Sequence, residues 1–130
     1  MRIGFCNGCF DKLHHGHRFF LEYAREYADW LIVAVNSDES VRGRKGEERP
    51  FLSVYERMRD LKSTGLADAI IPFNGDPIPL LLAIRPHALI RGEDQSDEGR
   101  EYAQRVFRVP RLHGFSTTEL NRKEIVRAPE

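Results

Sequence analysis

The sequence has few cysteines, no excess charge of either sign and no long apolar run, and each shortage excludes a class of protein. Two cysteines among 130 residues cannot supply the disulfide framework of a small secreted domain. Lys and Arg number 20, as do Asp and Glu, so the formal net charge is 0, without the bulk positive charge of a nucleic-acid-binding protein. The longest apolar stretches, residues 31–35 and 80–84, are too short to span a bilayer. No apolar signal-peptide core follows Met1. We therefore expect a cytoplasmic protein that binds neither nucleic acid nor membrane.

The remaining composition is that of one globular domain. Hydrophobic residues make up 41% of the chain and charged residues 31%, which are ordinary values for a folded protein. A chain of 130 residues is long enough for one packed core and too short to favour two. We therefore expect a single domain over residues 1–130.

Short apolar runs alternate along the chain with segments of helical periodicity. Runs without polar alternation predict buried strands at residues 3–6, 30–35, 69–73, 88–90 and 106–109. Helices are predicted over residues 17–27, from a capping box at 53, over 77–84, around 98–104 and from a second capping box at 116 through 125. Strands covered on both faces are typical of parallel sheets. The expected fold is α/β: a doubly wound, Rossmann-like single domain with a mainly five-stranded parallel sheet and helices on both faces.

The longest segment with neither pattern is residues 36–52, and it is basic. Arg42, Arg44, Lys45 and Arg49 lie in it among only a few acids. Solvated loops often have this composition, so the charges alone do not decide between a plain surface loop and a binding segment. Ligands of parallel α/β sheets bind beyond the carboxyl ends of the strands, and this segment leaves the second strand at that end. We therefore expect a loop that can clamp an anion.

The most informative segment is residues 8–17, with the sequence GCFDKLHHGH, between the first strand and its helix. A strand-to-helix turn directs free backbone amides and the positive end of the helix dipole toward one point. His14 and His17 flank that point, and Gly16 lets a base or ribose pack against the backbone. Two imidazoles beside a helix N-terminus suit the negative charge that develops at phosphorus during a transfer. The alternative is that the histidines only cap the helix or bind surface water.

This segment resembles the HxGH signature of the cytidylyltransferase-like nucleotidyltransferase superfamily. The resemblance covers about residues 3–125 and is closest to the heptose-1-phosphate adenylyltransferase domain, while glycerol-3-phosphate cytidylyltransferases share most of the landmarks. The further landmarks are VNSD at 35–38, KG at 45–46, RP at 49–50, ERM at 56–58, GED at 92–94 and GFSTT at 114–118.

The resemblance implies a reaction in which a sugar or polyol phosphate attacks the α-phosphate of a nucleoside triphosphate and releases pyrophosphate. It favours ATP with a sugar phosphate such as a heptose 1-phosphate, and CTP with glycerol 3-phosphate is the alternative. Mg²⁺ is expected to arrive with the triphosphate rather than in a protein cage. No general base is required, because a phosphate monoester is already anionic. The resemblance further implies a homodimer and, upstream, a sugar kinase.

The same resemblance assigns roles to individual residues. Catalysis is expected of His14, His17, Lys45, Arg111 and Thr117. Nucleotide contacts are expected from Gly8, Cys9, Phe10, Asp11, His14, Gly16, His17, Gly92, Asp94, Arg111, Phe115, Ser116, Thr117 and Thr118. Acceptor contacts are expected from Asp38, Lys45 and Arg57, and no protein metal ligand is expected.

The cysteines suggest a different class of protein, a zinc or redox module. Cys6, Cys9, His14 and His17 have zinc-competent side chains at the spacing C-x2-C-x4-H-x2-H. This spacing begins like a zinc knuckle but lacks the last ligand at the proper distance, and nothing else in the sequence supports a thioredoxin-type pair. Burial as a small apolar residue explains Cys6 equally well.

Overall fold

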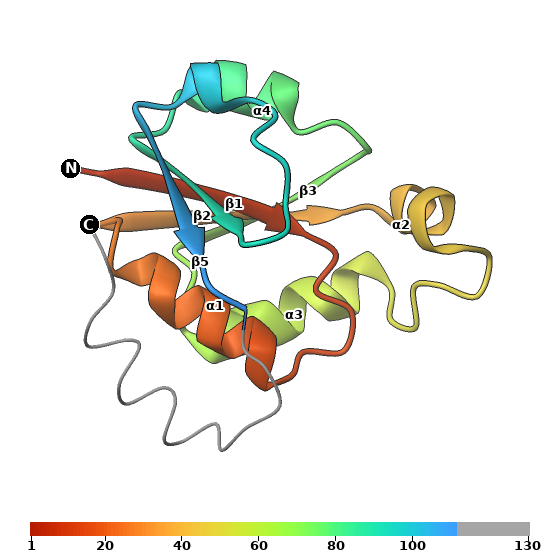
Figure 1. The fold of residues 1–130 in the computed structure, drawn as a ribbon. Helices are drawn as coiled ribbons and strands as arrows, with labels where there is room; N and C mark the ends of the chain where they lie inside the picture. Colours follow the sequence, from red (N-terminus) through yellow and green to blue (C-terminus); the bar gives the residue numbers. More distant parts are fainter. Residues whose placement is uncertain (112–130) are drawn as a thin grey trace.

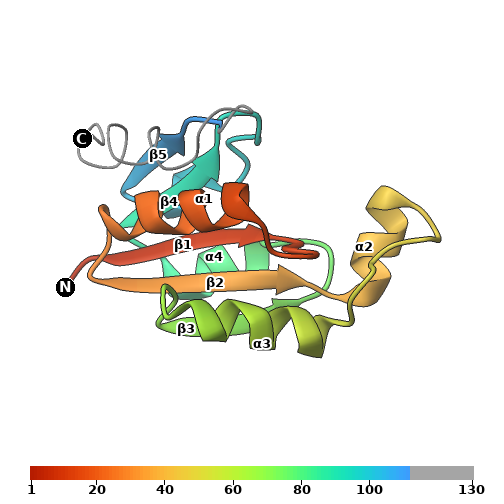
Figure 2. The same ribbon diagram turned by 90° about the horizontal axis from the view of Figure 1, so that it is seen from below.

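The computed structural model describes residues 1–111 (Figures 1 and 2), and its centre is a parallel β-sheet. The strands are β1 (Ile3–Gly8), β2 (Trp30–Asn36), β3 (Ala69–Phe73), β4 (Ala88–Gly92) and β5 (Arg105–Val109). They lie in the order β3-β2-β1-β4-β5, and all their pairings are parallel. The chain winds outward from β1 to β3 and then returns to add β4 and β5 on the other side of β1. The expected doubly wound, five-stranded parallel sheet is confirmed.

Helices cover both faces of the sheet, as the sequence predicts. The helices α1 (His15–Arg25) and α3 (Val54–Thr64) lie on one face, and α4 (Ile78–Ile84) lies on the other (Figures 1 and 2). Neighbouring residues of one strand point to opposite layers. In β1, Cys6 packs in the cluster that contains Leu61 of α3, while Phe5 packs in the cluster that contains Leu81 of α4. Each fully buried large apolar side chain contributes roughly 1.5–3 kcal/mol to folding.

Helix α3 begins at the predicted capping box. Ser53 Oγ accepts a hydrogen bond from the Glu56 amide at 3.2 Å, and the Glu56 carboxylate accepts one from the Ser53 amide at 2.9 Å. The helix ends at Gly65, whose φ of 73° lies in the left-handed region that glycine adopts without strain. The capping box and Gly65 therefore fix where α3 begins and where it ends.

Residues 36–52, which we expected to be a loop, contain the helix α2 (Asp38–Lys45). Ser37 caps it, because its Oγ accepts from the Ser40 amide at 3.1 Å. Val41 is the buried residue of α2, so the helix has no apolar stripe on which a periodicity argument could depend. The prediction of a loop here is wrong, and α2 projects beyond the C-terminal end of β2 (Figure 1).

The helix expected around residues 98–104 is also wrong, since only the short 3-10 helix η1 (Arg100–Tyr102) forms there. The expected last helix, residues 116–125, lies outside the described residues. Within residues 1–111, none of the helices is long and apolar enough to cross a membrane.

Candidate active site

The sheet changes its winding direction between β1 and β4, and a cleft of about 500 Å³ lies at their C-terminal ends. Gly8 at the end of β1 and Gly92 at the end of β4 both line it. Doubly wound sheets bind their ligands at such a switch point. We call this space the β1/β4 cleft. The sequence-predicted site residues that line it are Gly8, Cys9, Phe10, Asp11, His14, Gly16, His17, Lys45 and Gly92.

The two signature histidines form the N-terminus of α1. His14 is the N-cap, and its Nδ1 accepts a hydrogen bond from the Gly16 amide at 3.0 Å. His17 Nδ1 accepts from the His14 amide at 3.3 Å, and the two rings stack with centroids 3.9 Å apart. A ring nitrogen that accepts carries no proton, so these hydrogen bonds assign the proton of each ring to Nε2. Helix capping and ligand binding are therefore compatible, because each uses a different nitrogen.

Gly16 gives the His14 ring the space to cap the helix. A Cβ at Gly16 would lie 2.9 Å from His14 Cε1 and 3.1 Å from His14 Nδ1. Contacts this close would push the ring away from the cap. Gly16 also lines the β1/β4 cleft, so the expected packing of a base or ribose against its backbone stays a prediction.

His17 is neutral at pH 7. Burial, followed by the nearby charges of His14 and Lys45, lowers its pKa to about 4, while Asp11 acts in the opposite direction. Neutrality agrees with the Nδ1 atom acting as an acceptor. Lys45, the last residue of α2, lines the same cleft as His17. The lysine thus lies where the sequence analysis expected it, although a helix carries it there rather than a loop.

The backbone between β1 and α1 is held in a strained shape. Phe10 and Lys12 have φ angles of 51° and 56°, a region that costs a non-glycine residue on the order of 1–2 kcal/mol. Phe10 is buried, and its ring centroid lies 5.6 Å from that of His17. The Asp11 carboxylate accepts from the amides of Phe51 and Leu52 at 2.8 and 3.0 Å. The burial of Phe10 and the hydrogen bonds accepted by Asp11 hold the loop in this conformation despite its energetic cost.

Arg57 was expected to bind the acceptor, but the structure gives it another environment. Its side chain is 0% exposed, and its guanidinium donates to Leu52 O at 3.0 Å, Cys9 O at 2.8 Å and Asp38 Oδ1 at 2.7 Å. The three acceptors belong to the segment before α3, the loop after β1 and the first turn of α2. Arg57 therefore holds these segments together, and Asp38 is its partner. Neither side chain lines the β1/β4 cleft.

The expected nucleotide contacts beyond the signature are only partly within the described residues. Arg111 and Asp94 form an ion pair on the surface. Asp94 lines a second cavity, of about 410 Å³, and not the β1/β4 cleft. The remaining expected contacts, Phe115, Ser116, Thr117 and Thr118, lie outside residues 1–111.

The sequence analysis missed Arg91, which is buried in β4 and lines the same second cavity. Its Nη1 donates to the side chain of Asn7, which is itself buried in β1. The sequence feature that could have identified Arg91 is its position: a charged residue directly after the apolar run 88–90, at the end of a strand where ligands bind.

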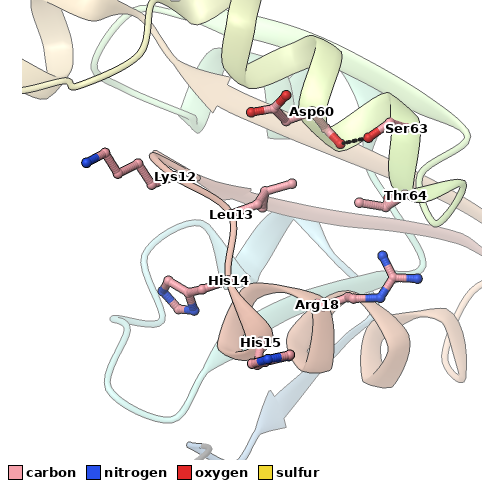
Figure 3. Close-up of a pocket in the computed structure, with 8 residues that line it drawn as sticks. All are labelled: Lys12, Leu13, His14, His15, Arg18, Asp60, Ser63 and Thr64. Atoms are coloured by element: carbon pink, nitrogen blue, oxygen red, sulfur yellow. Dashed lines mark hydrogen bonds between the residues drawn. The ribbon is translucent and has the colours of Figure 1, made fainter.

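A third cavity, of about 620 Å³, lies between α1 and α3. Figure 3 shows His15 and Arg18 on α1, with Asp60 and Ser63 on α3 across from them. It is larger than the β1/β4 cleft and shares Lys12 and His14 with it, but none of its lining residues within residues 1–111 belongs to a strand. His17, Lys45 and Gly92 are absent from its lining within residues 1–111. We therefore take the β1/β4 cleft as the candidate active site.

The zinc and redox alternatives do not fit the structure. Cys6 is 0% exposed in the core, and burial raises the pKa of its thiol to about 12. Cys9 Sγ instead lies 3.9 Å from Asn36 Oδ1. Metal binding and thiol exchange both require an accessible thiolate. In the part of the chain that the structure describes, no three His, Cys, Asp or Glu residues form a group able to hold a metal ion.

The chain is similar in sequence to long bacterial proteins. It is 42% identical over 130 residues to the bifunctional protein HldE of Koribacter versatilis, an alignment that covers 94% of this chain and 27% of the relative. It is 41% identical over 127 residues to the bifunctional protein HldE of Pelobacter propionicus, covering 92% and 26% of the two chains. The chain thus spans about a quarter of the length of the curated relatives it matches.

Solved structures share the fold. The lipopolysaccharide core biosynthesis protein from Thermoplasma volcanium superposes with a TM-score of 0.74 at 22% identity, over 86% of this chain and 98% of that one. Pantothenate synthetase from Thermus thermophilus superposes with a TM-score of 0.60 at 17% identity, over 97% and 66%. Identities this low support the fold alone. Residues 5–124 match one family from the first strand through the signature and beyond. This match confirms the resemblance drawn from the motifs: the chain belongs to the cytidylyltransferase-like family.

Proposed function

We propose that this domain is a nucleotidyltransferase that transfers AMP from ATP to a sugar phosphate, such as a heptose 1-phosphate, and releases pyrophosphate. The observation that carries the proposal is the convergence of His14, His17 and Lys45 on one cleft at the switch point of the sheet. Family membership supports the reaction class. The chain is 42% identical to a bifunctional HldE protein, and its motifs resemble those of heptose-1-phosphate adenylyltransferases. Both facts favour ATP with a heptose 1-phosphate over CTP with glycerol 3-phosphate.

The reaction follows from the positions of these groups. An oxygen of the acceptor phosphate forms a bond to the α-phosphorus, the bond from that phosphorus to the bridging oxygen breaks, and pyrophosphate leaves with the electron pair. Negative charge grows on the phosphate oxygens during this step. The Nε2 protons of His14 and His17 and the amides at the start of α1 are donors suited to that charge. The Lys45 ammonium adds a positive charge from α2.

Mg²⁺ fits this site as an ion that enters with the triphosphate. Asp11 is the carboxylate among the described lining residues, and its two oxygens already accept hydrogen bonds from backbone amides. The triphosphate oxygens would therefore hold the ion, with Asp11 suited to its hydration shell. Bound Mg²⁺ would neutralise charge on the leaving pyrophosphate.

The setting of the domain is part of the same proposal. The relatives are called bifunctional, and this chain spans 27% of one of them. We propose that the second function of such a bifunctional protein is a sugar kinase activity, which supplies the phosphorylated acceptor. We also propose that the domain acts in the cytoplasm as a homodimer.

A pyrophosphate-release screen tests the proposal. ATP, CTP, GTP and UTP are each paired with heptose 1-phosphate, other sugar 1-phosphates and glycerol 3-phosphate. We expect ATP with heptose 1-phosphate to give the highest kcat/KM, and His17→Ala serves as the inactive control. Preference for CTP with glycerol 3-phosphate would favour the alternative. Absence of pyrophosphate with every pair would overturn nucleotidyl transfer.

A further inference from the structure

Arg57 and Arg91 are both buried, but they differ in how their charge is compensated. Arg57 pairs with the Asp38 carboxylate. Arg91 is 4% exposed and donates from Nη1 to Asn7 Oδ1 and from Nη2 to Glu98 O at 3.0 Å. Its Nε has no hydrogen-bond partner, and it forms no ion pair with a carboxylate of residues 1–111.

A buried cation without an anionic partner is costly. Burial lowers the pKa of Arg91, and the electrostatic effects of Cys6 and Glu98 oppose that shift only in part. An unpaired buried charge destabilises a fold by several kcal/mol, and a bound anion would remove that penalty. A guanidinium has five N–H donors, of which the two protein acceptors use two. The free donors of Arg91 are therefore suited to a phosphate.

Arg91 lines the second cavity, of about 410 Å³, where its surroundings suit a phosphorylated sugar. Arg44, from the last turn of α2, supplies a second positive charge. Ser96 and Gln95 supply hydroxyl and amide groups, and Asp94 and Glu98 supply carboxylates, that can bond to sugar hydroxyls. The lining contains no aromatic side chain within residues 1–111, so it offers no stacking surface for a base. Its volume lies within the usual range for small-ligand pockets.

The second cavity adjoins the β1/β4 cleft, because Asn7 and Gln95 line both. Asn7 is also the residue that accepts from Arg91. A phosphate bound by Arg91 would thus lie beside the wall between the two spaces. A transfer between two phosphates requires such adjacency, since attacking oxygen and phosphorus must approach to about 3–3.5 Å.

We propose that the second cavity is the acceptor subsite, in which Arg91 and Arg44 bind the phosphate of a sugar phosphate while Ser96 and Glu98 bond to its hydroxyls. The inference rests on the proposed nucleotidyl transfer and names where its second substrate binds. It also replaces Arg57 by Arg91 as the buried arginine that contacts the acceptor.

Steady-state kinetics with ATP and heptose 1-phosphate tests the subsite in three variants. Arg91→Met removes the donors and keeps much of the side-chain volume, and Arg44→Gln removes the charge at the α2 end. Arg105→Met is the matched control, because Arg105 is exposed and pairs with Ala88 at the opposite end of β4. We expect Arg91→Met to raise the acceptor KM at least about tenfold and Arg44→Gln to raise it less, with the ATP KM within about twofold. Arg105→Met leaves both constants unchanged.

Stability and binding measurements complete the test. Arg91→Met removes a costly buried charge but leaves Asn7 Oδ1 and Glu98 O without their donor, so circular dichroism checks its folding before the kinetics. If it does not fold, Arg44→Gln on the surface still reports on the subsite. An unchanged acceptor KM in the folded variants, or an equal rise in the ATP KM, would overturn the proposal.

Calorimetric titration with heptose 1-phosphate separates failure of the subsite from failure of the proposed function. If the wild-type protein releases no pyrophosphate with any pair, the proposed function fails. Binding that is present in the wild type and lost in Arg91→Met would still support the subsite. Equal binding by both proteins, or none by the wild type, would overturn it.

Discussion

Replacing Arg57 by methionine tests whether this residue is a structural connector or a substrate contact. The side chain is 0% exposed, and its three hydrogen bonds join the β1–α1 loop, α2 and the start of α3. Methionine fills much of the same volume and makes none of these bonds. Arg57→Met should therefore lower the stability of the fold and loosen the loop that carries Cys9.

The size of the effect follows from what is lost. Removing one partner of a buried ion pair costs about 3–5 kcal/mol, and hydrogen bonds from a charged group contribute about 1.5–3 kcal/mol each. The Asp38 side chain is 36% exposed, so water can solvate the carboxylate that is left behind. We therefore expect a loss near the lower limit, about 3 kcal/mol, which lowers Tm by roughly 10 °C in a domain of this size. Asp38→Asn keeps an acceptor for Arg57 and should cost about 1 kcal/mol.

Urea unfolding at pH 7, followed by circular dichroism, measures the loss. Arg59→Met is the control, because Arg59 is exposed on the same helix and its replacement should change stability by less than about 0.5 kcal/mol. Activity is measured at a temperature where all variants are folded, and kcat should fall in Arg57→Met with little change in the acceptor KM. A stable Arg57→Met protein with a raised acceptor KM would refute the connector and restore Arg57 as a substrate contact.

Further predictions concern the cleft. His17→Ala should lower kcat by roughly 10²–10³ with the fold intact, as loss of a transition-state donor does, whereas His15→Ala, at an exposed position outside the cleft lining, should not. Lys45→Ala should lower kcat/KM at least tenfold, about 1.4 kcal/mol. Arg42→Ala, on the same helix, is the control and should lower kcat/KM much less. Equal losses in the two variants at fixed salt would indicate only a general attraction of anions. His17 is neutral in the folded protein down to a pKa of about 4, whereas the ordinary pKa of histidine is 6.5. The unfolded chain therefore binds more protons between these values, and stability falls as pH drops through that range; His17→Gln should flatten this dependence in unfolding curves recorded at pH 7 and 5. Removing Mg²⁺ with EDTA should abolish pyrophosphate release, and added Mg²⁺ should restore it.

The strands could be predicted because a parallel sheet covered on both faces leaves unbroken apolar runs in the sequence. The run 69–73 coincides with β3. Strand β1 continues two residues past its apolar run, since Asn7 and Gly8 still pair with Ala34 and Val35 of β2. Backbone pairing, rather than side-chain polarity, ends that strand. Helix α2 was missed for the opposite reason, because Val41 is the buried residue that it contributes to the core.

The histidine site could be predicted because its geometry is local. His14, Gly16 and His17 lie within one helical turn, so a strand-to-helix junction is sufficient to bring them together. A further reason for Gly16 could not be predicted, because the contact that excludes a Cβ comes from the His14 ring. Sequence spacing gave the residues that meet, but not which nitrogen each imidazole leaves free for a ligand.

The two buried arginines show where prediction from sequence ends. Arg57 lies three residues after Val54 and four before Leu61, so helical periodicity already places it toward the core. Arg91 directly follows the apolar run of β4, which equally implies burial. Whether a buried guanidinium is paired, however, depends on groups that the fold brings from elsewhere, namely Asp38 for Arg57 and Asn7 for Arg91. A carboxylate completes the first site and makes it a structural connector. A neutral amide leaves the second one without a paired carboxylate, and our proposal that Arg91, rather than Arg57, binds the acceptor phosphate rests on that difference.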